Sequence, residues 1–252
     1  MTNALIGYTG FVGGNLKAQQ VFDDFYNSKN INSINGKHYN SVICAGVSAV
    51  KWMANKEPEK DRLHLDGLTK HLKNITVDKF ILISTVDVYP NPVNVDENSD
   101  IDLDTCHPYG KHRLELEKFI KDRFDTLIVR LPGLFGSGLR KNIIYDFLNN
   151  NNVEQINPHG RFQFYYLNHL SKDIKIALEN DLELVNITTE PTSVSDVAKI
   201  CLGHKFESDI NSPGALYDYK TIHAELYGGK DGYMYNKEQV LDDLKKYVES
   251  QR

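Results

Sequence analysis

The sequence lacks the features that define several large classes of protein. No apolar run approaches the ~20 residues that a membrane span needs. No basic n-region precedes the first apolar run, so we expect no signal peptide and no membrane partner. Acidic residues outnumber basic ones, 34 against 29, and the formal net charge of −5 argues against a nucleic-acid partner. The sequence therefore predicts a cytoplasmic protein.

Metal and disulfide chemistry have as little support. The three cysteines, Cys44, Cys106 and Cys201, are far apart in the sequence and match neither a disulfide framework nor a zinc pattern. The nine histidines include no His-Glu-x-x-His motif. We expect no metal site.

The residues that are present describe an ordinary globular chain. Its 252 residues are 40% hydrophobic and 25% charged, which fits one domain with a substantial core. Apolar runs alternate with helical patterns, and this alternation is typical of a doubly wound parallel α/β sheet. We expect strands at residues 4–6, 22–26, 41–45, 80–84, 126–131 and 182–187.

Helices are expected between these strands. Pro58 and Pro108 suit first helical positions, and Ser193 and Asn236 suit N-caps of two later helices. The charged run 56–62 is interpreted as a solvated helix start. Only 14 residues, 27–40, separate the second strand from the next, too few for a helical crossover and a strand. We expect that part of the sheet to be abbreviated.

A glycine-rich turn follows the first strand. Gly7, Gly10 and Gly13 lie where a strand passes into a helix, and glycine there lets backbone N–H groups approach a pyrophosphate. We predict that a dinucleotide binds this turn, at Gly7, Thr9, Gly10, Phe11, Val12 and Gly13. The alternative is a tight turn without a ligand.

Cofactor choice depends on the residues about 20 positions beyond the first glycine, where an acid would bind the ribose 2′-hydroxyl of NAD. Asn27, Ser28 and Lys29 occupy this region, and Asp23 and Asp24 precede it, at the expected start of the second strand. Polar and basic groups accept a 2′-phosphate. The sequence therefore favours NADP over NAD.

Further motifs carry a family resemblance. Residues 84–89 end a strand as Ser-Thr-Val-Asp-Val-Tyr, and 24 residues after Thr85 comes Tyr109, which opens Tyr-Gly-Lys-His-Arg with Glu117 beyond. With the glycine turn, these motifs resemble the extended short-chain dehydrogenase/reductase family of NAD(P)-dependent sugar epimerases, dehydratases and reductases. Residues 130–136 and 163–169 are similar to two of its loops, the second with Asn168 and His169 in place of two acids. The resemblance covers the chain to about residue 200.

The resemblance implies a Rossmann-type sheet and a catalytic set of Thr85, Tyr109 and Arg113. Tyr109 would be the acid/base, and Thr85 would bind the substrate oxygen. A phenol near pKa 10 is a weak base at neutral pH, so a neighbouring cation must lower its pKa. The family has lysine where this chain has Arg113, which supplies charge and can bond ribose hydroxyls but cannot shuttle a proton. Lys111 points roughly 200° away from the tyrosine on a helix.

The resemblance also implies further contacts. Cys44, Ala45 and Gly46 would pass beneath the nicotinamide ribose, and Pro132, Gly133 and Leu134 would meet its carboxamide. Family dehydratases have two acids after the threonine, but this chain has Val86 and then Asp87, which favours a reductase or epimerase. Each of these residues also has a purely structural interpretation. Candidate substrate residues are Ser84, Asp87, Arg140, Asn142 and Arg161.

Together these observations predict an NAD(P)-dependent reductase or epimerase acting on a hydroxyl or keto group of a sugar or nucleotide sugar. The alternative is a catalytically impaired dinucleotide-binding sensor or scaffold. We expect the cofactor-binding core at about 1–131 and 162–190, and a small substrate lobe at about 132–161 and 191–252. A homodimer is common in the family.

Overall fold

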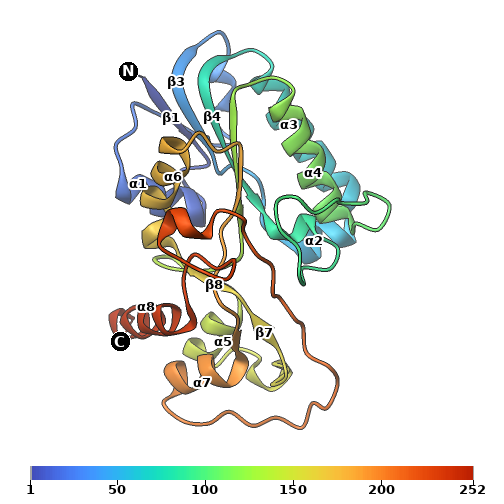
Figure 1. Cartoon of the computed structure of the whole chain (residues 1–252). Coiled ribbons are helices and arrows are strands. Elements are labelled where there is room, and N and C mark those ends of the chain that lie inside the picture. Colours follow the sequence, from blue (N-terminus) through green and yellow to red (C-terminus); the bar gives the residue numbers. More distant parts are fainter. Residues whose placement is uncertain (1, 252) are drawn as a thin grey trace. The chain divides into compact units, whose positions relative to one another are not determined.

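The computed structural model describes residues 2–251. The chain divides into two compact units (Figure 1). The first unit comprises residues 1–90, 100–130 and 171–185, and the second comprises residues 91–99, 131–170 and 186–252. Residues 91–99, 162–170 and 186–190, which the sequence groups with the core, belong to the second unit. Within 2–251, no helix has the length and apolar character to cross a membrane.

A six-stranded sheet organises the first unit. Its strand order is β2-β1-β3-β4-β5-β9, and β1 pairs in parallel with both β2 and β3, as β3 does with β4. Every strand expected from the sequence is present. The bounds are Asn3–Ile6 (β1), Asp24–Tyr26 (β2), His38–Cys44 (β3), Thr76–Thr85 (β4), Thr126–Leu131 (β5) and Leu184–Asn186 (β9).

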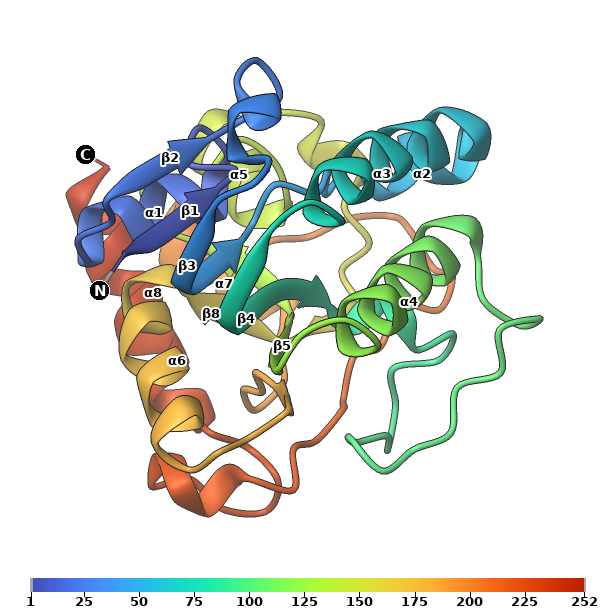
Figure 2. The same ribbon diagram turned by 90° about the horizontal axis from the view of Figure 1, so that it is seen from above.

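Helices cover both faces of this sheet. Figures 1 and 2 show α1 and α6 on one face and α2, α3 and α4 on the other. The bounds are Phe11–Gln19 (α1), Lys51–Lys56 (α2), Pro58–Leu72 (α3), Pro108–Lys121 (α4) and Leu170–Glu179 (α6). The doubly wound, Rossmann-type arrangement expected from the sequence is confirmed.

Burial on both faces explains the apolar strands. On β3 and β4, Val42 and Phe80 are fully buried and face a core that receives Leu72 of α3 and Ile120 of α4. The opposite face buries Ile81, which is 1% exposed. A strand covered by helices on both sides has no solvated side, so its sequence is a continuous apolar run and does not alternate.

The connection from β2 to β3 is abbreviated, as the spacing predicts. A single 3-10 turn, η1 (Ile31–Ile34), replaces a helix there and buries Ile34 completely. Three further 3-10 turns, η2 to η4, cover Val86–Val88, Val153–Gln155 and Leu167–His169, and η5 covers Ala224–Tyr227.

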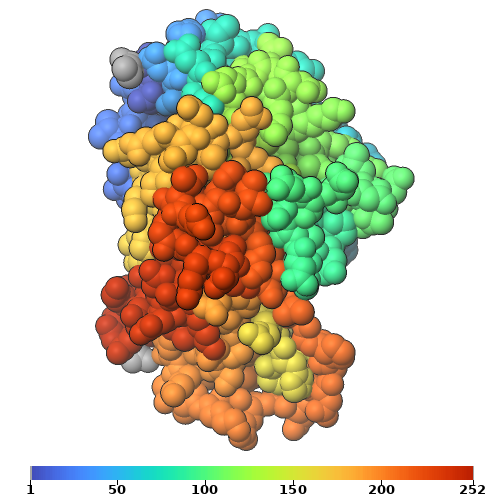
Figure 3. Space-filling model, viewed as in Figure 1, coloured from blue at the N-terminus to red at the C-terminus, as the bar shows by residue number. Residues whose placement is uncertain are grey.

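Among the residues that the structure describes, the second unit has two small sheets and the helices α5, α7 and α8. Strands β6 and β8 pair in parallel, and β7 and β10 pair antiparallel. Capping boxes formed by Ser193 with Asp196 and by Asn236 with Gln239 open α7 and α8, as predicted. Residues 203–213 follow α7 as a mostly exposed strip, orange in Figure 3. The bounds are Gly133–Phe135 (β6), Arg161–Phe162 (β7), Phe164–Tyr166 (β8), Thr192–Ser193 (β10), Ile143–Asn149 (α5), Val194–Leu202 (α7) and Lys237–Ser250 (α8).

A buried glutamine joins three segments of the second unit. The Gln163 amide nitrogen donates to the backbone oxygens of Thr189 (2.6 Å) and Tyr219 (3.0 Å). Its oxygen accepts from the Tyr219 backbone N–H at 3.0 Å. Gln163 is 2% exposed, so these backbone groups have no ready access to water.

We predict that Gln163→Ala lowers the free energy of unfolding by about 2–4 kcal/mol, because buried backbone groups lose their partners. Urea unfolding followed by circular dichroism measures the change. Gln155→Ala is the matched control, because Gln155 is exposed and its side-chain amide donates to the side chain of its neighbour Glu154. A loss below about 1 kcal/mol for Gln163→Ala would contradict this role.

Candidate active site

The parallel strands of the first unit end together. Because β1, β3 and β4 run in the same direction, their carboxyl ends bring Gly7, residues 44–46 and Thr85 to one edge of the sheet. Open α/β sheets bind their ligands outside this edge. These candidate site residues therefore lie together at the carboxyl edge of the sheet.

Close packing explains two of the three glycines in the turn. Gly7 has φ +87°, and a Cβ on it would lie 2.5 Å from the backbone of Ala45. A Cβ on Gly13 would lie 2.1 Å from the Gly7 carbonyl oxygen, a distance no side chain tolerates. These two glycines let the turn pass the end of β3 and let α1 pack against the turn.

The third glycine leaves the start of α1 open. Gly10 is the N-cap of α1 and brings no side-chain hydrogen bond, and the first turn contains no acid. Thr9 and Gly10 are exposed, and Phe11 and Val12 are partly exposed. A helix start with uncapped N–H groups and no negative charge suits a diphosphate, so these residues fit the group that the motif implies.

The residues after β2 are polar and carry no acid. The Asn27 side chain donates to the Tyr8 hydroxyl at 3.2 Å, and its oxygen accepts from the Lys29 backbone N–H at 2.9 Å. Ser28 and Lys29 are exposed. Tyr8, which the sequence analysis did not select, therefore orients Asn27.

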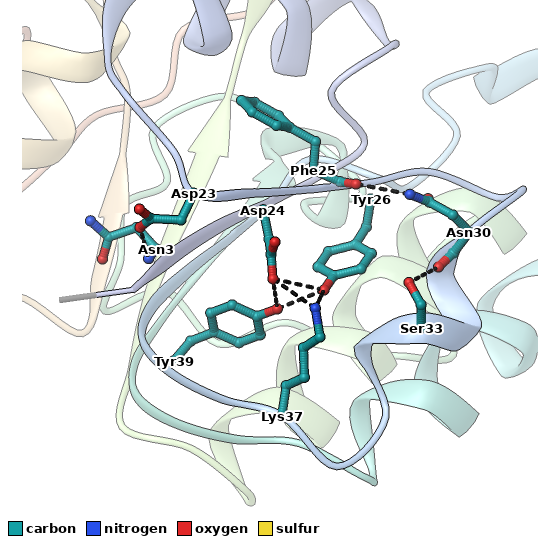
Figure 4. Close-up of polar contacts among 9 residues, drawn as sticks. All are labelled: Asn3, Asp23, Asp24, Phe25, Tyr26, Asn30, Ser33, Lys37 and Tyr39. Atoms are coloured by element: carbon teal, nitrogen blue, oxygen red, sulfur yellow. Dashed lines mark hydrogen bonds and ion pairs between the residues drawn. The ribbon is translucent and has the colours of Figure 1, made fainter.

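The two acids before this loop are held elsewhere (Figure 4). Asp23 accepts from the Asn3 backbone N–H at 2.7 Å. One oxygen of Asp24 lies 2.8 Å from the Lys37 ammonium and 2.5 Å from the Tyr39 hydroxyl. Hydrogen bonds from Lys37 and Tyr39 lower the pKa of Asp24 despite its partial burial. Asp24 opens β2, as expected, and its negative charge is paired there with the Lys37 ammonium.

Tyr109 and Thr85 are brought together from different elements. Tyr109 is the second residue of α4 and is 5% exposed. The Thr85 side chain at the end of β4 lies close enough to the Tyr109 phenol to lower the pKa of that phenol. The side chain of Asn55 on α2 accepts the Tyr109 backbone N–H at 2.9 Å. The structure thus assembles the pair that the resemblance implies.

Arg113 is buried beneath the tyrosine, one helical turn along α4. Its guanidinium carbon lies 4.4 Å from the centre of the Tyr109 ring. Two of its nitrogens bond both oxygens of Asp61 at 2.7 and 2.9 Å, and a third contact at 2.6 Å reaches the Ser48 carbonyl. The Nδ1 of His112 lies 2.8 Å from Asp61 as well. Asp61 lies in the run 56–62 but is 9% exposed, so the expectation of a wholly solvated helix start is wrong there.

These contacts determine the titration of the two acidic groups. Burial alone would raise the pKa of Asp61, but hydrogen bonds from Arg113 and His112 outweigh it and lower that pKa. Burial raises the pKa of the Tyr109 phenol, and Arg113 opposes this effect without reversing it. The expected influence of Arg113 is present, but the phenol stays protonated at neutral pH.

Ser84 belongs to a buried network behind the site. Its hydroxyl donates to Glu117 at 2.5 Å, and Glu117 binds the Arg130 guanidinium at 2.7 Å. Arg130 also donates to the Tyr89 hydroxyl at 2.8 Å. Ser84 thus faces this network, which gives it a structural role in this unit.

The remaining candidates lie in the second unit. Gly133 and Leu134 belong to β6, and Pro132 precedes it. Asn142 caps α5 with its oxygen and donates to the Leu134 carbonyl at 2.8 Å. Arg161 is an exposed residue of β7, and Arg140 is exposed before α5.

The cysteines are free, and burial raises the pKa of the Cys44 thiol to about 11. Cys44 is therefore no nucleophile, and it fills the end of β3 beside Ala45 and Gly46. Among residues 2–251, no group of three or more His, Cys, Asp or Glu side chains could hold a metal ion.

Several site residues carried no usable sequence signal. Asp61 is 52 positions before its partner Arg113, and Lys51 is 36 positions before Asp87, whose carboxylate it binds at 2.7 Å. The Asn55 side chain contacts the backbone N–H of Tyr109, a contact that does not depend on the type of the partner residue. Such pairs become visible only when α3 is placed beside α4 and α2 is placed beside α4 and η2.

No protein-family model matches this sequence, and no curated protein matches it. Solved structures do match over the whole chain. They include a UDP-N-acetylglucosamine 4-epimerase from Methanobrevibacter ruminantium in complex with UDP-N-acetylmuramic acid (TM-score 0.76, 15% identity) and a UDP-glucose 4-epimerase from Thermotoga maritima with UDP-glucose (TM-score 0.75, 18% identity). A dTDP-4-dehydrorhamnose reductase from Clostridium acetobutylicum has a TM-score of 0.74 at 15% identity. Each alignment covers 100% of this chain and 99% of the other. The chain has the fold of these nucleotide-sugar enzymes.

We predict that Asp61→Asn lowers the free energy of unfolding at pH 7 by about 3–5 kcal/mol, because it leaves the buried Arg113 charge without its partner. The folded-state pKa of Asp61 is lowered, so its contribution is present above the unfolded pKa of about 3.9 and disappears as the pH falls through the folded value. The difference between wild type and variant should therefore shrink in acid.

Urea unfolding at pH 7 and at pH 3 measures this dependence. Asp66→Asn, on the exposed face of the same helix, is the matched control and should change little. Equal losses for both variants, or a loss for Asp61→Asn that is independent of pH, would contradict the assignment.

Proposed function

We propose that this chain is an NAD(P)-dependent oxidoreductase that acts as a reductase on the keto group of a nucleotide sugar. The single observation that carries the proposal is that Thr85 and Tyr109 lie close together in the same unit as the glycine turn. An acid/base phenol and an anion-binding helix start are the two parts that a nicotinamide-dependent reduction needs from a protein.

The glycine turn supports the coenzyme part of the proposal. Gly10 and the exposed start of α1 would hold the diphosphate, and the small residues Ala45 and Gly46 would leave room beside it. A bound reduced nicotinamide would supply the hydride that adds to the carbonyl carbon. The chain's own task is to bind, orient and protonate the substrate.

Tyr109 would carry out the protonation. Thr85 would hold the carbonyl oxygen, and the phenol would give its proton to that oxygen as the alcohol forms, with a proton from water restoring the phenol afterwards. Because burial raises the pKa of Tyr109, the phenol is the protonated species at neutral pH. A donor in this state favours reduction over an epimerase cycle, which needs the phenolate as a base as well.

The substrate class rests on the similar structures. Both epimerases are described with UDP-sugars, and the third enzyme is a dTDP-4-dehydrorhamnose reductase. The loop after β2 favours NADP, because Asn27, Ser28 and Lys29 bring no acid to the ribose and Asp24 is neutralised by Lys37. Free cysteines agree with a cytoplasmic location.

Tyr109→Phe should lower turnover of nucleotide-linked 4-keto sugars by about 10²–10⁴-fold, because the proton donor is gone, and leave coenzyme affinity within about twofold. Coenzyme oxidation followed at 340 nm and fluorescence titration with NADPH measure the two effects. Tyr145→Phe on α5 is the matched control. Full activity of Tyr109→Phe, or no turnover by the wild type on any 4-keto sugar of a UDP and dTDP panel, would contradict the proposal.

Lys29→Ala should weaken NADPH binding by about tenfold and leave NADH binding unchanged, because one charged contact to the 2′-phosphate is lost. Isothermal titration with each coenzyme measures this. Lys70→Ala, an exposed substitution on α3, should alter neither affinity. Equal losses for the two coenzymes, or no loss for NADPH, would exclude Lys29 as a 2′-phosphate ligand.

A further inference from the structure

The Arg113 guanidinium, which lies beside Tyr109 on α4, is bound mainly to Asp61. Arg113 stacks on the Tyr109 ring, but its two terminal nitrogens form a fork with both oxygens of Asp61. Arg113 and Asp61 are 3% and 9% exposed, so this pair is neutral in a poorly solvated site. The resemblance implies a lysine ammonium at position 113, and this chain has an arginine paired with Asp61 at that position.

A second cation approaches from another helix. Lys51 and Asn55 lie four residues apart on α2 and therefore share a face. Asn55 accepts the backbone N–H of Tyr109 at 2.9 Å, and the Lys51 ammonium lies 2.7 Å from a carboxylate oxygen of Asp87. Trp52 and Met53 point outward and are 65% and 45% exposed. The polar face of α2 is thus the one directed to the tyrosine.

The turn that carries Asp87 is pressed against the start of α4. A Cβ on Gly110 would lie 2.4 Å from the Asp87 carbonyl oxygen, so only glycine allows this approach. The Asp87 backbone N–H donates to the Thr85 hydroxyl at 3.1 Å. Thr85, Asp87, Tyr109 and Lys51 therefore form one cluster, built from β4, η2, α4 and α2.

We propose that Lys51 is a positioning residue whose ammonium, held on Asp87, offsets that carboxylate beside Tyr109 and adds to Arg113 a second positive charge that acts on the Tyr109 proton. The proposal rests on the proposed function, because it assigns to Tyr109 the role of proton donor. It assigns part of the control of the Tyr109 proton to α2, a short helix that lies outside the sequence motifs.

The charges around the phenol agree with this assignment. Burial and the Asp87 carboxylate raise the pKa of Tyr109, while Arg113 and Lys51 lower it. His107 stacks on the Tyr109 ring with 6.2 Å between ring centres, and burial and Lys51 lower its pKa, so it is neutral at neutral pH. Lys51 thus offsets the Asp87 carboxylate, which acts on the same phenol in the opposite direction.

The test follows the ionisation of residue 109 directly, without coenzyme or substrate. The protein is produced with 3-fluorotyrosine, and the ¹⁹F resonance of position 109 is assigned by its absence from Tyr109→Phe. Lys51→Met should move the titration of this resonance up by about 0.5–1 pH unit, and Asp87→Asn should move it down by a similar amount. Lys51→Arg should titrate as the wild type does.

Lys56→Met, on the same helix but exposed, is the matched control and should leave the titration in place. The proposal is overturned if Lys51→Met titrates with the wild type, or if Lys56→Met moves the resonance equally. If Lys51→Met does not fold, Asp87→Asn decides, and an unchanged titration in that variant overturns the proposal.

The pH dependence of turnover separates this inference from the proposed function. In a reductase with Tyr109 as donor, the alkaline limb of kcat should follow the same order of variants as the fluorine titration. Fluorine shifts without any dependence of turnover on Tyr109 would refute the proposed function alone. Loss of turnover in Tyr109→Phe with no shift in the Lys51 and Asp87 variants would refute the role of Lys51 alone.

Discussion

The balance of charge around one buried phenol is the constraint that organises the candidate active site. A tyrosine that loses nearly all contact with water holds its proton more tightly, and only nearby cations can offset this effect. Here Arg113 supplies part of the offset through its stacking on the Tyr109 ring, but Asp61 binds its charge at both terminal nitrogens. The Lys51–Asp87 pair completes the set, with a cation and an anion of opposite influence on the same proton.

The backbone fixes these groups in place before any ligand arrives. Glycines at 7, 13 and 110 allow contacts that a Cβ would forbid, so the turn after β1 and the turn after β4 each pack directly against a helix start. Behind them, Glu117 and Arg130 form a buried ion pair that ties α4 to β5. Such a pair contributes more to a defined arrangement than to net stability, because desolvation offsets much of its attraction.

The sequence predicted most of the first unit because its signals are local. Buried strands are apolar runs, the starts of α3 and α4 carry Pro58 and Pro108, and the short 27–40 segment leaves no room for a helix. The sequence did not predict α2, which has six residues and only one buried apolar side chain, Ala54. It also did not predict α6, although Leu170, Ile174 and Ala177 have helical spacing and are buried.

In the candidate active site, the sequence predicts the motif residues Thr85 and Tyr109 but not the charged groups that surround the Tyr109 phenol. The influence of Arg113 on the Tyr109 phenol depends on its ion pair with Asp61. The influence of Asp87 on the same phenol depends on its ion pair with Lys51. Both partners, Asp61 and Lys51, are distant in sequence. Ser84 illustrates the converse, because a polar residue at the carboxyl edge of the sheet faces an internal network. Residue type and order indicate a chemistry, but the partners of each charge follow from tertiary packing.

The most direct test of this account is a crystal structure of the chain grown with NADPH. We predict density for the diphosphate on the N–H groups that open α1, the 2′-phosphate beside Lys29, and the nicotinamide ring next to the Tyr109 hydroxyl. A dinucleotide bound elsewhere, or a fully occupied coenzyme whose nicotinamide lies away from Tyr109, would contradict it.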